Sequence, residues 1–67
     1  MIYLFSKRHQ FVQCEIHPGS PHVFTVVDST GEELTERYHS AADLRERWYE
    51  VTSQLTSDGW NGPHAIE

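Results

Sequence analysis

The sequence predicts an α+β fold, a three- or four-stranded antiparallel meander sheet followed by one C-terminal amphipathic helix packed on one face. Short β-prone runs separated by turn residues occupy 1–39, and a helical periodicity occupies 40–58. Residues 59–67 are interpreted as a C-terminal tail. Because 67 residues can bury only one small core, we expect a single domain spanning 1–67.

The first two β-prone runs are 2–6 and 10–17. The first is short and rich in β-branched and aromatic residues, which favours a strand. The second alternates with the period of two of a half-buried strand. Its apolar phase comprises Val12, Cys14 and Ile16, and its polar phase Gln13, Glu15 and His17. The pattern leaves open whether 2–6 and 10–17 are one bent strand or two.

Two turns organise the rest of the sheet. Pro-Gly-Ser-Pro at 18–21 ends the preceding strand, because proline cannot donate to a ladder and glycine accepts a positive φ. Residues 23–27 form the most β-prone run, and Asp-Ser-Thr-Gly at 28–31 has the composition of a type I turn. Residues 34–39 should therefore pair back on the run before them. Short connections favour sequential antiparallel pairing.

The helix has a clear start, face and end. Ser40 is expected to cap it, with Asp43 placed favourably for the helix dipole. The predicted buried stripe recurs at spacings of four, three and four: Leu44, Trp48, Val51 and Leu55. Glu46 and Ser53 are expected on the exposed side. The glycine in Asp-Gly-Trp at 58–60 can end the helix in a left-handed conformation.

The C-terminal half resembles the ending of some small bacterial proteins with no known activity. The residues that carry this resemblance are Arg-Tyr-His-Ser at 37–40, Arg47-Trp48, Asp-Gly-Trp at 58–60 and Gly62-Pro63. The resemblance implies a bacterial source and a ββα core. It implies nothing about chemistry.

Composition indicates the cellular compartment of the protein and the classes of partner that it disfavours. Ten acidic against five basic residues give a net charge of −5, which disfavours nucleic acid as a partner. A single cysteine, Cys14, cannot form a disulfide within the chain and fits a reducing compartment. The N-terminal apolar run is too short for a signal peptide or a membrane span. We therefore expect a cytoplasmic protein without a membrane partner.

Metal and catalytic hypotheses find weak support in the residue spacing. Cys14, His17 and His22 are the best metal candidates, but Cys14 and His17 point to opposite faces of a strand. Partial dyads can be drawn from Cys14 with His17 or His39, and from Ser40 with Asp43, but no glycine motif supports them. We expect no metal, no cofactor and no enzymatic activity.

The sheet has two faces and the helix can cover one. If Val12, Cys14, Ile16, Val23 and Val27 face the helix, alternation sends an apolar set to the other face. Alternation sends Phe11, Phe24 and Val26 there, and one of the pairs Ile2 with Leu4 or Tyr3 with Phe5 goes with them. We take the expected partner interface as Tyr3, Phe5, Phe11, Phe24 and Val26. Alternatively, the N-terminal strand or a tail containing Trp60 and Ile66 covers this face.

The primary functional hypothesis is a noncatalytic protein-interaction module, which forms a homodimer through the second face or an edge of its sheet or binds another protein. The alternative is a single-stranded nucleic-acid-binding sheet, because exposed aromatic rings can stack on bases. That alternative would use Tyr3, Phe5, Phe11 and Phe24 with Lys7 and Arg8.

Overall fold

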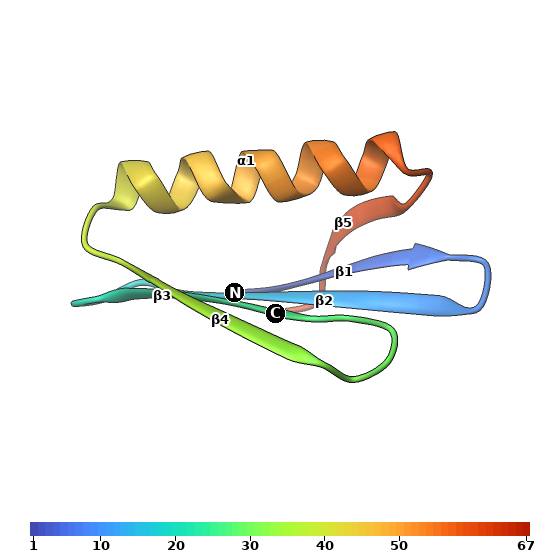
Figure 1. The fold of residues 1–67 in the computed structure, drawn as a ribbon, viewed down its shortest axis with the longest axis horizontal. Helices are drawn as coiled ribbons and strands as arrows, with labels where there is room; N and C mark the ends of the chain where they lie inside the picture. Colours follow the sequence, from blue (N-terminus) through green and yellow to red (C-terminus); the bar gives the residue numbers. More distant parts are fainter.

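The computed structural model describes residues 1–67 and has one sheet and one helix (Figure 1). The elements in chain order are β1 (Ile2–Lys7), β2 (Gln10–His17), β3 (His22–Val27), β4 (Glu33–Tyr38), α1 (Ala41–Ser57) and β5 (Asn61–Ala65). The sheet is antiparallel throughout and has the order β4-β3-β2-β1-β5. The α+β class is confirmed. No helix has the length and apolar character needed to cross a bilayer.

Tight turns explain the meander. The backbone of Arg8 has a φ of 57°, so β1 and β2 are two strands joined by a sharp reversal. In the β3–β4 turn, Asp28 Oδ1 accepts hydrogen bonds from the Thr30 N–H, the Thr30 hydroxyl and the Glu32 N–H. These bonds lower the pKa of Asp28 below its ordinary value, the Thr30 hydroxyl contributing most. The carboxylate therefore stabilises the hairpin turn in its ionised form.

Both ends of α1 follow the sequence prediction. The Ser40 Oγ accepts hydrogen bonds from the N–H groups of Ala42 and Asp43, at 3.1 and 3.3 Å. At the other end Gly59 has a φ of 90°, and the Trp60 N–H donates to the Leu55 carbonyl at 3.0 Å. This is the reversal of a glycine-terminated helix.

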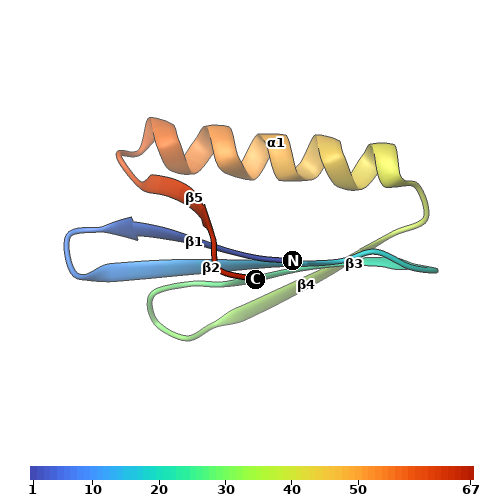
Figure 2. The same cartoon turned by 180° about the vertical axis from the view of Figure 1, so that it is seen from behind.

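The segment interpreted as a tail contains the fifth strand. β5 pairs with β1 on the side opposite β2, so β1 becomes an interior strand (Figure 2). Gly62 allows this approach, because a Cβ there would lie 2.8 Å from Phe5 Cδ2 and 2.9 Å from the Leu4 carbonyl oxygen. The pairing continues beyond β5, where the Ile2 N–H donates to the Glu67 carbonyl at 2.8 Å.

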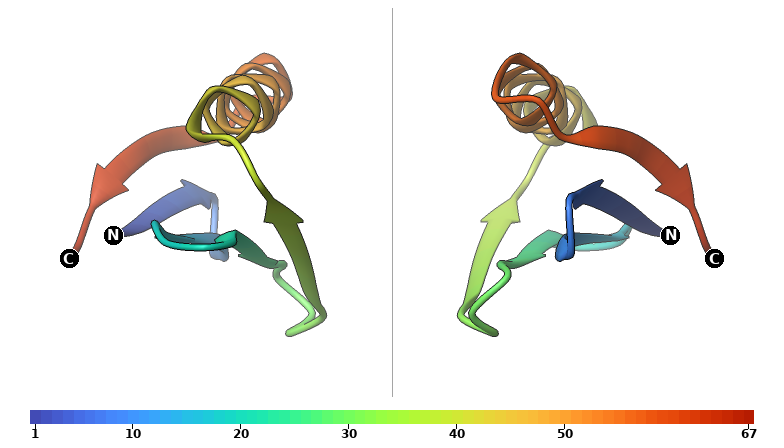
Figure 3. Two further views of the ribbon diagram at one scale, coloured as in Figure 1. Left: turned by 90° about the vertical axis from the view of Figure 1, so that its left-hand side faces the viewer. Right: turned by 90° about the vertical axis from the view of Figure 1, so that its right-hand side faces the viewer.

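The helix covers one face of a curved sheet, and the other face is uncovered (Figure 3). The buried apolar side chains are Phe5, Val12, Cys14, Ile16, Phe24 and Leu44. The predicted helical stripe faces this core, but of its four residues only Leu44 is buried, and Trp48, Val51 and Leu55 are half-buried against the core. Glu46 is exposed, but Ser53, expected on the exposed side, is half-buried.

The expected assignment of β3 to the two faces is wrong. Ile16 pairs with Phe24 and Cys14 with Val26, so both β3 residues share the helix-covered face with β2. Val23 and Val27 lie instead on the open face, which is the face of the sheet that the helix does not cover. The turn at 18–21 sets this register, and a shift of one residue moves every side chain of a strand to the other face.

Candidate functional site

The expected interface residues do not form one surface. Phe5 and Phe24 have no exposed area, and Tyr3 and Val26 are half-buried against the core beneath the helix. Phe11 pairs with Ser6 on the open face and is 54% exposed. The apolar patch predicted on the second face is therefore reduced to Phe11 and the half-buried aliphatic side chains around the polar residues of that face.

Three of the aromatic rings surround Trp48. Its ring centroid lies 4.9 Å from that of Tyr3, 6.0 Å from that of Phe5 and 6.1 Å from that of Phe24. Tilted and edge-on contacts at these distances stabilise a core. The single-stranded nucleic-acid hypothesis needed these rings exposed on a sheet face, an arrangement that the register does not provide.

Polar contacts divide the open face. Gln13 Nε2 donates to Glu15 Oε1 at 2.8 Å, and the other Glu15 oxygen lies 3.3 Å from His17 Nε2. The hydroxyls of Thr25 and Thr35 are 3.2 Å apart across β3 and β4. Half-buried aliphatic side chains occupy the positions between these groups: Ile2, Leu4, Val23 and Val27. The open face is thus a mixed surface, not a continuous apolar one.

The outer edge of β4 is a regular strand edge. The Asp28 N–H donates to the Glu32 carbonyl at 2.9 Å, so these two residues form a hydrogen-bonded pair. Alternation along the antiparallel ladder then directs the backbone N–H and C=O groups of Glu33, Thr35 and Arg37 away from β3. They have no neighbouring strand.

The opposite edge of the sheet is less suited to pairing. β5 contains Pro63, which has no N–H to donate, and its register with β1 shifts between Leu4 and Ser6. β4 has neither a proline nor a register shift along its six residues. The two edges therefore differ, and β4 presents the ladder that another strand can extend.

An apolar groove lies between α1 and the β3–β4 hairpin, where the helix and β4 diverge towards the turn (Figure 1). Its volume is about 570 Å³. Its apolar lining comprises Val12, Val26, Leu34, Val51 and Leu55. Sequence reasoning missed this site. The available signal was Leu34, which lies in a charged segment and is 56% exposed.

Ion pairing secures the helix beside this groove. Arg47 Nε donates to Glu36 Oε1 at 2.9 Å, and Arg47 Nη1 lies 3.6 Å from a carboxylate oxygen of Glu50. The bond to Glu36 raises the pKa of Arg47. The Tyr38 hydroxyl donates to the same Glu36 oxygen at 3.0 Å, and the pKa of Tyr38 is raised, mainly by burial.

The three metal candidates do not form a cluster, and the hydroxyl of Ser40 is engaged as the helix cap by the N–H groups of Ala42 and Asp43. Cys14 is buried beneath the helix, His17 is exposed on the open face, and the ring of His22 accepts the Gly19 N–H at 3.1 Å. No group of three or more His, Cys, Asp or Glu side chains has the geometry to hold a metal ion. Burial raises the pKa of the Cys14 thiol to about 11, so it is protonated at neutral pH.

Comparison of the chain with family models, curated proteins and solved structures gave no match. The candidate surfaces therefore rest on the geometry described above: the open β4 edge and the apolar groove beside it.

Proposed function

We propose that this chain is a noncatalytic protein-interaction module that forms a homodimer through the free edge of β4. The observation that supports this most directly is the unpaired backbone of Glu33, Thr35 and Arg37 on a regular edge strand. An added antiparallel strand satisfies such groups. The product would be a continuous sheet with both helices on the same side.

The charges on β4 suit pairing with a second copy. A two-fold axis at Thr35 places this residue opposite itself and Glu33 opposite Arg37 of the second copy. All three are outward-directed positions of the ladder, so their backbone groups are in register for hydrogen bonding. The two cross-strand pairs then join opposite charges, and such pairs favour one register over its alternatives.

A small core adds a thermodynamic reason for association. The structure buries 7 of its 67 residues, and chains of this size gain limited stability from their own core. Self-association therefore stabilises both the strand edge and the fold.

The register can be tested by exchanging charges. Glu33→Arg alone and Arg37→Glu alone place like charges opposite each other, so each should weaken the dimer. The double variant restores opposite charges and should restore the dimer. Sedimentation velocity across a range of micromolar concentrations measures the association. Arg45→Glu makes the same charge change as Arg37→Glu at an exposed position on the helix, so it should leave the dimer unchanged.

A backbone variant tests the edge itself. Thr35→Pro removes the central outward-directed N–H without removing a β3–β4 hydrogen bond, so it should yield a folded monomer. Thr35→Val is the matched control, because it loses the hydroxyl contact with Thr25 but keeps the N–H. An unmodified chain that sediments as a monomer throughout, or a dimer indifferent to both the proline and the charge variants, would refute the proposal.

A further inference from the structure

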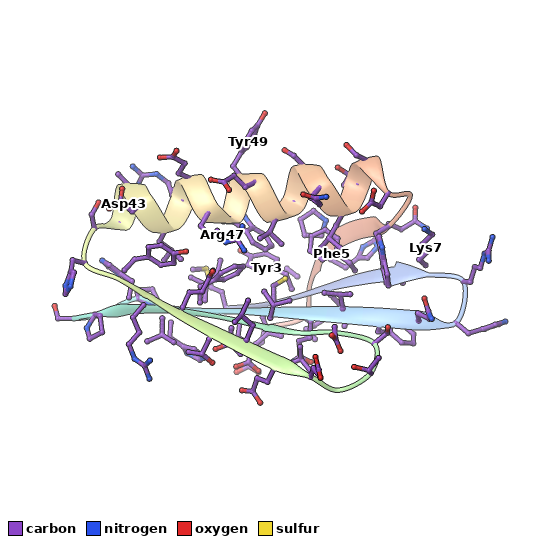
Figure 4. The ribbon with its side chains drawn as sticks, viewed as in Figure 1. Tyr3, Phe5, Lys7, Asp43, Arg47 and Tyr49 are labelled. Atoms are coloured by element: carbon purple, nitrogen blue, oxygen red, sulfur yellow. The ribbon has the colours of Figure 1, made fainter.

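The groove between α1 and the β3–β4 hairpin combines an apolar floor with an acidic rim. Val12, at its base, is 6% exposed, while Leu34 on the strand side is 56% exposed. Val51 and Leu55 contribute from the helix and are half-buried. Arg47 lies on the part of the helix above the sheet (Figure 4) and is the first residue of α1 in the groove lining. The volume of about 570 Å³ is within the usual range of binding sites.

The rim carries an excess of negative charge. Four carboxylates line the groove: Asp28, Glu32, Glu33 and Glu50. The side chains of Glu32 and Glu33 make no hydrogen bond or ion pair within the chain. Asp28 is held in its ionised form by the turn that it caps. The charges of Glu32 and Glu33 are therefore not neutralised by any group of the same chain.

The single cation of the lining does not offset this charge. Arg47 is already engaged by Glu36 at 2.9 Å, and Glu36 lies outside the groove lining. Its contact with Glu50 is longer, at 3.6 Å. A ligand that approaches the groove thus meets apolar side chains bordered by carboxylates, with the positive charge partly neutralised in advance.

We propose that this groove binds a segment of a partner protein in which apolar side chains alternate with, or are flanked by, lysine or arginine. The apolar side chains would contact Leu34, Val51 and Leu55, and the cations would pair with the rim carboxylates. Charge complementarity of this kind selects partners and speeds their encounter. The groove is formed within one chain, so the proposal does not depend on dimerisation through β4.

A synthetic peptide in which leucine alternates with lysine is a suitable probe. Titration of the isotope-labelled full chain, followed by amide chemical shifts, should move signals of Leu34, Val51, Gln54 and Leu55. Two peptides of equal length serve as controls. One replaces each lysine by glutamate and removes the charge match, and the other replaces each leucine by serine and removes the apolar contact. Neither should produce the shifts.

Variants of the chain test the rim separately from the dimer. Glu32→Gln combined with Glu50→Gln removes two rim charges outside β4 and should weaken binding of the leucine-lysine peptide roughly fivefold, as expected for two exposed ion pairs. Glu46→Gln combined with Glu67→Gln makes the same change in net charge elsewhere and should leave binding unchanged. Sedimentation of both variants should match that of the unmodified chain.

Three results would overturn this inference. Equal binding of the glutamate peptide would exclude charge recognition. Equal weakening of peptide binding by the two double variants would show that binding depends only on the net charge of the chain. Shifts of the groove signals on concentration of the peptide-free chain, together with shifts at the Arg8-His9 turn, would show that the groove receives the basic hairpin of a second copy instead.

Discussion

Trp48 shows how a single side chain joins the two layers of this protein. The ring of Trp48, which belongs to α1, packs against the rings of Tyr3 and Phe5 in β1 and of Phe24 in β3. Tyr49, the next residue on the helix, points away from the sheet and is 75% exposed (Figure 4). The two neighbours therefore contribute very differently to stability, although both are aromatic.

Trp48→Ala should reduce the free energy of unfolding by about 3 kcal/mol or more, the usual cost of removing a large aromatic side chain from a core. In so small a domain that loss is a large part of the total stability. Urea unfolding monitored by circular dichroism measures it. Tyr49→Ala is the control and should change the stability by less than about 0.5 kcal/mol. Similar losses in both variants would contradict the packing of Trp48 against the core.

Cys14 is buried in an apolar environment that disfavours its thiolate. Because its pKa is raised to about 11 in the folded state, the unfolded chain loses this proton at a lower pH than the folded chain does. The folded state is then disfavoured as the pH rises from about 9 to about 11. The stability contributed by this thiol is fully present below that window.

The Cys14→Ala variant should therefore show a shallower loss of stability across alkaline pH than the unmodified chain. Urea midpoints measured at several values between neutral pH and pH of about 11 give the two slopes. A disulfide-type thiol reagent at pH 8 should react slowly with the folded chain and rapidly in urea. Rapid reaction without urea would show that Cys14 is accessible.

Among the elements, β5 depends on one glycine. Gly62 has a φ of 144°, and a Cβ there would meet both the ring of Phe5 and the carbonyl of Leu4. The contact with a backbone atom is difficult to relieve, because it requires the β1–β5 pair to separate. Gly31 also has a positive φ, 88°, but a Cβ there would meet nothing within 4 Å.

Gly62→Ala should destabilise the protein by about 2 to 4 kcal/mol, the combined cost of overpacking and of a left-handed backbone. Gly31→Ala carries the conformational cost alone and should lose about 1 kcal/mol. Amide hydrogen exchange should also show faster exchange at the Ile2 and Ile66 N–H groups, which lie in this pairing, in the Gly62 variant. Equal losses in both variants would mean that β5 does not pack as described.

At the scale of the whole molecule, association and stability are linked. If folding is coupled to the β4–β4 contact, a tenfold dilution should lower the free energy of unfolding by about 1.4 kcal/mol per dimer. The melting temperature of the unmodified chain should fall on dilution. That of Arg37→Glu should be lower and independent of concentration. Concentration-independent melting of the unmodified chain would argue against a stabilising dimer.

The sequence by itself determined the local elements. Ser40 and Gly59 mark the two ends of the helix, because capping and a left-handed backbone are properties of single residues. The stripe from Leu44 to Leu55 follows from the helical period. The hairpin turn at Asp28 was likewise readable from composition. Each of these features depends on residues close together in the chain.

The tertiary structure decided how these elements share two faces. The register between β2 and β3 brings Phe24 and Val26 under the helix, and no local pattern distinguishes it from a shift of one residue, because β3 is apolar in both phases. β5 arises only because Gly62 meets Phe5, which is distant in the sequence, and the acidic groove arises only because Leu34 and Val51 come to line the same hollow. Non-local packing, not local propensity, therefore sets the surfaces through which this protein can act.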